Sequence, residues 1–99
     1  MVHPTALIAE LVKAANETGT NKLHLNHQLI ERAIVAICEL SEVAELRSNR
    51  KVEDAVAYLQ GVELQISRSE SSDHAVRSAL LFAAGMIREL HIILSDLRS

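Results

Sequence analysis

Apolar residues recur in alternating steps of three and four positions along almost all of this 99-residue chain. The longest run is Val76, Leu80, Ala83, Ile87, Leu90, Leu94 and Leu97. Steps of three or four return to one face of an α-helix, whereas a half-buried strand needs steps of two. One Pro and three Gly are also too few for a fold built from many short strands and turns. The sequence therefore predicts an all-α protein.

Three short polar breaks divide this pattern into four helices within a single domain, residues 1–99. We predict helices over roughly 4–18, 22–47, 51–68 and 72–97 from the periodicity and the end signals. Pro4 suits a first helical position, and Gly19 suits the residue that ends a helix. Short connections favour antiparallel neighbours, so we expect an up-down-up-down four-helix bundle with a short first helix.

The short first helix leaves part of the bundle uncovered. About 14 residues span ~21 Å, whereas the second and fourth helices, at about 25 residues each, span ~38 Å. The first helix should cover the N-terminal half of the second and leave the opposite end bare. The residues expected there are apolar and form the candidate partner or dimer interface: Val43, Leu46, Val56, Met86, Ile92, Ile93 and Leu97.

An exposed apolar patch of this kind is normally an interaction site, and a twofold homodimer is the commonest way for a small domain to cover one. We therefore expect a homodimer, with another protein as the alternative partner. If the first helix instead packs further along the bundle than we expect, Ile92 is an ordinary exposed apolar residue.

Charge and cysteine content restrict the partners and the compartment. Ten Lys and Arg against 13 Asp and Glu give a net charge of −3, which argues against nucleic acid as the partner. The longest uncharged run, Ser78 to Ile87, is about half a membrane span, so we expect no membrane contact. Cys38 has no second cysteine to pair with, and a thiol in the core fits a reducing compartment. We expect a cytoplasmic protein.

Two histidines and a glutamate have the spacing of metal ligands. His24, His27 and Glu31 could share one helical face and offer two nitrogens and an oxygen to a divalent transition metal. A His and a Glu four residues apart are also ordinary on a solvated helix face. We predict no metal and no cofactor, and keep these three residues as the candidate ligands.

The segment from Arg68 to His74 offers an enzymatic alternative. The spacing of its Arg and His resembles the catalytic pair of HEPN-type ribonucleases, which are dimeric helical bundles. That resemblance implies a metal-independent ribonuclease in which Arg68 stabilises phosphate charge and His74 moves a proton. The intervening acidic residues would repel RNA, and Asp73 with Arg77 gives the segment a structural role in starting a helix.

A second enzymatic alternative rests on acidic residues. Glu39, Glu42 and Glu45, with Asp54 or with Glu70 and Asp73 downstream, resemble the paired carboxylates of all-α nucleotide pyrophosphohydrolases, which would imply a magnesium-dependent hydrolase. The apolar stripe through Ile37 and Leu40 leaves these glutamates on the opposite, solvated side.

Gly61 and Gly85 lie inside predicted helices, where each costs about 1 kcal/mol relative to Ala. The close approach of another helix would explain them, and so would simple tolerance.

The sequence has no glycine-rich phosphate loop, no cysteine pair and no nucleophile elbow. We therefore predict a small protein-interaction module of the adaptor, inhibitor or chaperone type, not an enzyme, acting through an apolar helical surface.

Overall fold

A computed structural model describes residues 4–17, 23–44, 49–68, 70 and 72–97 of the chain. They form four helices, α1 (Pro4–Asn16), α2 (Leu23–Val43), α3 (Arg50–Ser67) and α4 (Asp73–Leu97). The described ranges contain no strand, so the all-α prediction is confirmed. The largest difference from the expected bounds is at α2, which ends at Val43 and not near residue 47. Apolar spacing defines the face of a helix more sharply than its ends, which commonly fray.

Polar residues in the breaks fix where the last two helices begin. The Asn49 side chain accepts a hydrogen bond of 2.8 Å from the Lys51 backbone N–H and caps α3. The Ser72 hydroxyl accepts one of 3.1 Å from the Ala75 N–H. Asp73 then places a carboxylate in the first turn of α4, where the helix dipole favours negative charge.

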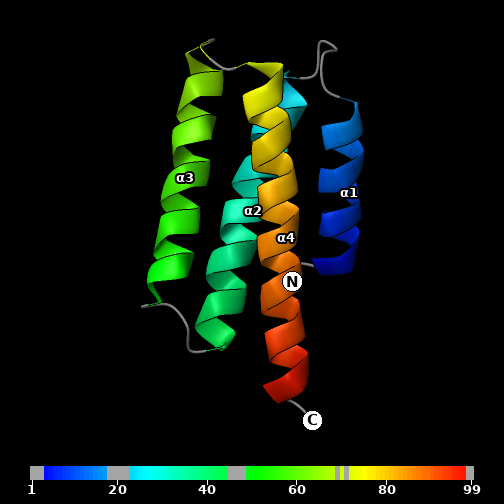
Figure 1. Cartoon of the computed structure of the whole chain (residues 1–99), viewed down its shortest axis with the longest axis vertical. Coiled ribbons are helices and arrows are strands. Elements are labelled where there is room, and N and C mark those ends of the chain that lie inside the picture. The colour runs from blue at the N-terminus through cyan, green and yellow to red at the C-terminus, as the bar shows by residue number, and fades with distance from the viewer. Residues whose placement is uncertain (1–3, 18–22, 45–48, 69, 71, 98–99) are drawn as a thin grey trace.

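The four helices are arranged around α2 and α4. α4 contacts all three other helices, and its contact with α1 is the most extensive. α1 and α3 lie on opposite sides of the central pair (Figure 1), and their described residues do not touch. The expected contact of α1 with α2 is present, but it is less extensive than the contact of α1 with α4. α2 and α4 pack directly on each other, so α1 docks chiefly on α4.

Aliphatic residues fill the core, as the periodicity predicts. Five residues of α3 that follow one another in steps of three and four are all buried, namely Val52, Ala55, Leu59, Val62 and Ile66. The buried alanines of α4, Ala79, Ala83 and Ala84, leave room for neighbouring helices to come close. The radius of gyration is 13.2 Å, close to the ~13 Å typical of a compact domain of about 100 residues.

The lengths of α1 and α4 differ strongly. α1 has 13 residues and α4 has 25, which correspond to about 20 Å and about 37 Å of helix. Figure 1 shows the C-terminal part of α4, drawn orange to red, extending beyond the end of α1. One end of the central pair therefore has no α1 residue beside it.

α4 is also the one helix in the described part of the chain that is long and apolar enough to cross a membrane, over Asp73–Asp96. Core helices of soluble proteins meet the same criterion. Here α4 contributes buried residues to the core and contacts every other helix.

The two helical glycines have open space beside them. A methyl group added at Gly61 or at Gly85 would meet no atom within 4 Å, the helix's own backbone aside. Among the described residues, no neighbouring helix therefore comes close enough to Gly61 or Gly85 to require a glycine there.

Candidate functional site

The face of α2 that lies along α1 continues past the start of α1. Leu25 lines a groove between the two helices, and Arg32 Nη2 lies 2.9 Å from Glu10 Oε2 of α1. The two helices run in opposite directions (Figure 1), and α1 begins at Pro4. α1 therefore reaches to about residue 38 of α2. Val43 continues the same face roughly five residues, or about 7 Å, further on, and is 62% exposed.

The interface residues predicted in α4 differ in how exposed they are. Ile92 is exposed and Ile93 is half-buried in the last turns of the helix. Met86 is only 5% exposed, because α4 packs on α2 and α3 as well as on α1, so it offers almost no surface to a partner. Leu46 and the side chain of Leu97 lie outside the described residues.

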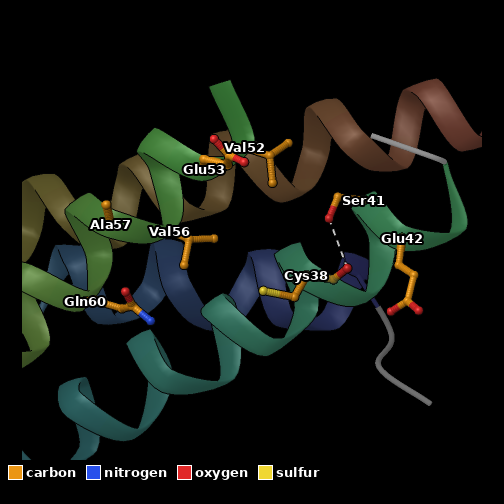
Figure 2. Close-up of a pocket in the computed structure, with 8 residues that line it drawn as sticks. All are labelled: Cys38, Ser41, Glu42, Val52, Glu53, Val56, Ala57 and Gln60. Carbon is orange, nitrogen blue, oxygen red and sulfur yellow. Dashed lines mark hydrogen bonds between the residues drawn. The ribbon is translucent and has the colours of Figure 1, made fainter. Parts of the chain in front are cut away.

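A groove of about 340 Å³ lies between α2 and α3 (Figure 2) and includes the predicted interface residue Val56. Its lining is mixed, with Cys38, Ser41, Glu42, Val52, Glu53, Val56, Ala57 and Gln60. The Ser41 hydroxyl donates to the Cys38 carbonyl at 3.0 Å, so its own helix satisfies it. Cys38 is exposed, and the expectation of a thiol in the core is wrong, because the residue lies one position past the buried Ile37.

The closest grouping of metal-ligand side chains lies across α2 and α3. One ligand atom each of His27, Glu31 and Glu63 lie within 4.8 Å of one another, the one such group of three in the described residues. His27 Nε2 is 3.8 Å from Glu63 Oε2 and 3.2 Å from the Ser67 hydroxyl. The structure thus brings together two of the three predicted candidate ligands, while the side chain of His24 lies outside the described part.

Sequence reasoning missed Glu63. It lies on a different helix, so no spacing along the chain connects it with His27 or Glu31. One feature of the sequence does point to it. Glu63 follows Val62, which is buried, so it lies at the border of the inward face of α3, where a side chain is partly covered.

The only two aromatic residues of the chain meet in a second groove, between α3 and α4. Tyr58 and Phe82 pack edge to face, with ring centroids 5.0 Å apart, and both are exposed. This groove of about 730 Å³ also includes Arg50 and Asp54. Near it, Lys51 Nζ pairs with Glu89 Oε1 at 2.7 Å and joins the two helices at the start of α3.

Arg68 and His74 are both exposed, and the described atoms show no hydrogen bond or ion pair between them. The backbone N–H of Arg68 donates to the Leu64 carbonyl at the end of α3, and His74 lies in the first turn of α4. Both residues therefore lie at helix ends, and the ribonuclease role stays a prediction.

The acidic residues that suggested a hydrolase remain apart from the metal-ligand group. Glu39, Glu42, Asp54, Glu70 and Asp73 are all exposed, and Glu45 lies outside the described residues. None belongs to the one described group of three metal-ligand side chains. Glu42 lines the α2–α3 groove together with Glu53, which was not among the predicted residues.

Comparison of the chain with models of protein families, with curated proteins and with solved structures finds no match.

Proposed function

We propose that this protein is a small interaction module, an up-down-up-down bundle that pairs with a second copy of itself through the end left uncovered by α1. The adaptor, inhibitor and chaperone classes all include proteins that work by such docking, and the proposed compartment is the cytoplasm. The opposite directions of colour along consecutive helices in Figure 1 support the bundle topology.

The observation that carries the proposal is the exposure of Val43. At 62% it is the most exposed large apolar side chain among the described residues. It continues the edge of α2 that lies along α1, where Leu25 and Arg32 are also exposed. A large apolar side chain left exposed beyond the end of a neighbouring helix is a place where another molecule can dock.

A second copy fits this end better than an unrelated partner. A twofold axis through the uncovered end brings the same apolar residues of both copies together, so one short stripe covers the other. Each apolar side chain of such an interface, Val43 among them, is then buried twice per dimer. Full burial of one such side chain is worth about 1.5–3 kcal/mol.

The test compares two valines on α2. Val43→Asp places a carboxylate in the proposed interface, twice per dimer, and should raise the dimer dissociation constant at least ~100-fold. Val35→Asp is the matched control, because Val35 is 48% exposed on the same helix and lies on the solvated side opposite the core. It should leave association unchanged.

Light scattering over a range of concentrations gives the mass, and circular dichroism verifies that each variant is helical. A dimeric wild type, a dimeric Val35→Asp and a monomeric Val43→Asp support the proposal. A monomeric wild type at every concentration, or a Val43→Asp variant that associates as well as the wild type, refutes it. Ile92→Asp should act in the same direction as Val43→Asp.

A further inference from the structure

We infer that His27, Glu31 and Glu63 form a binding site for one divalent transition-metal ion, with zinc as the representative, that ties α2 to α3. This inference goes beyond the proposed dimer and does not depend on it. It begins from the one group of described side chains that brings a nitrogen and two carboxylate ligands within 4.8 Å of one another.

The three ligands come from two neighbouring helices, α2 and α3. His27 and Glu31 are four residues apart on α2, so both side chains project from the same face. Glu63 approaches from α3, and its Oε2 is 3.8 Å from His27 Nε2. Ligands of a tetrahedral zinc ion are about 3.4 Å apart at bond lengths of about 2.0–2.2 Å. Modest side-chain rotations therefore close the site, and Glu31 is exposed and free to make them.

Glu63 presents one carboxylate oxygen that no described donor satisfies. Its Oε2 is buried and accepts no hydrogen bond from any described residue. The Glu63 side chain as a whole is 23% exposed, but this oxygen is shielded from solvent, and a cation beside it would stabilise it. No Lys or Arg in the described part of the chain pairs with Glu31 or Glu63. The nearby group that can supply a positive charge is the ring of His27 when it is protonated.

A divalent metal ion balances the charge of this group better than a proton on the His27 ring does. Two carboxylates carry two negative charges, and one imidazolium neutralises only one of them. A divalent ion neutralises both and also accepts the lone pair of the neutral ring. A mixed set of one imidazole and two carboxylates favours zinc and similar transition metals over magnesium and calcium, which prefer oxygen ligands.

A bound ion would hold α3 to α2. α3 makes no contact with α1 and only a limited one with α4, so it is held mainly by α2. The three ligands join these two helices directly. Binding through Nε2 would replace the hydrogen bond between His27 and Ser67 with a stronger link across the same pair of helices. Bound zinc should therefore stabilise the fold.

The test uses the purified full chain, stripped of metal with EDTA and titrated with ZnCl2 by calorimetry. His27→Gln and Glu63→Gln each remove one ligand and should weaken zinc binding more than ~10-fold, since even outer-shell partners are worth about 10–100-fold in metal affinity. Glu39→Gln and His74→Gln are the matched controls. Both residues are exposed and outside the group, and both variants should bind zinc as the wild type does.

We expect one zinc ion per chain and a rise in melting temperature of at least ~10 °C at 100 times the dissociation constant. No binding heat and no shift in the wild type would overturn the inference and leave a His27–Glu63 ion pair. Binding retained in both ligand variants would also overturn it, because the ion would then lie elsewhere.

A second measurement covers the case in which a ligand variant does not fold. In NMR spectra of the wild type, zinc should shift the ring signals of His27 and leave those of His74 in place. Signals of His27 that do not move at saturating zinc would reject the site.

Discussion

Replacing both helical glycines with alanine should make the protein more stable. Gly61 and Gly85 are exposed and inside α3 and α4. An added methyl group has no atom within 4 Å to meet at either position, so each substitution gains the full difference in helix propensity, about 0.8–1.0 kcal/mol. The two sites lie on different helices, and their effects should add to roughly 1.6–2 kcal/mol.

For a domain of this size, 1 kcal/mol shifts the melting temperature by about 4–8 °C. The double variant should therefore melt roughly 6–16 °C above the wild type in a circular dichroism scan. Ala57→Gly, at an exposed position one turn before Gly61, is the reverse change and should lower the melting temperature by a similar amount per site. All scans need one protein concentration, since the stability of a dimer depends on it.

A melting temperature that falls in the double variant would refute this reasoning. It would mean that the added methyl groups meet a helix that the described residues do not supply. Light scattering on the single variant Gly61→Ala then shows whether that helix packs at Gly61. If a partner helix approaches closely there, the alanine variant should associate less than the wild type.

Two further predictions concern the core and a helix cap. Leu80→Ala should cost about 2–5 kcal/mol, since Leu80 is fully buried, whereas the adjacent Leu81→Ala should cost less than about 0.5 kcal/mol, since Leu81 is 41% exposed; equal losses in denaturant unfolding would contradict the packing of α4. Asn49→Ala should cost about 1 kcal/mol by removing the cap of α3, and Asn49→Ser should restore most of it; a neutral alanine variant would show that the cap does not stabilise α3.

Most of the helical architecture could be predicted because burial in a helix follows a local period. The stripe through Leu80, Ile87 and Leu90 in α4 is predicted from spacing alone, and all three residues are buried. The period defines the inward face of each helix. It does not specify which neighbour that face meets, so the packing of α1 chiefly on α4 could not be predicted.

The sites depend on contacts between helices and were therefore predicted only in part. Val43 could be assigned to the uncovered end because helix lengths can be estimated from sequence. Met86 was misplaced, since its burial depends on how closely the other helices pack on α4. Glu63 was missed for the same reason, because only the folded chain brings α3 beside His27.

The contacts of α4 also bear on how the chain folds during synthesis. α1 leaves the ribosome first, yet the helix against which it packs most extensively is the last of the four to be made. Contacts between residues so far apart in sequence close large loops and form slowly. Until α4 emerges, the apolar stripes of α1 and α2 lack their main cover, and exposed apolar surface of this kind favours aggregation.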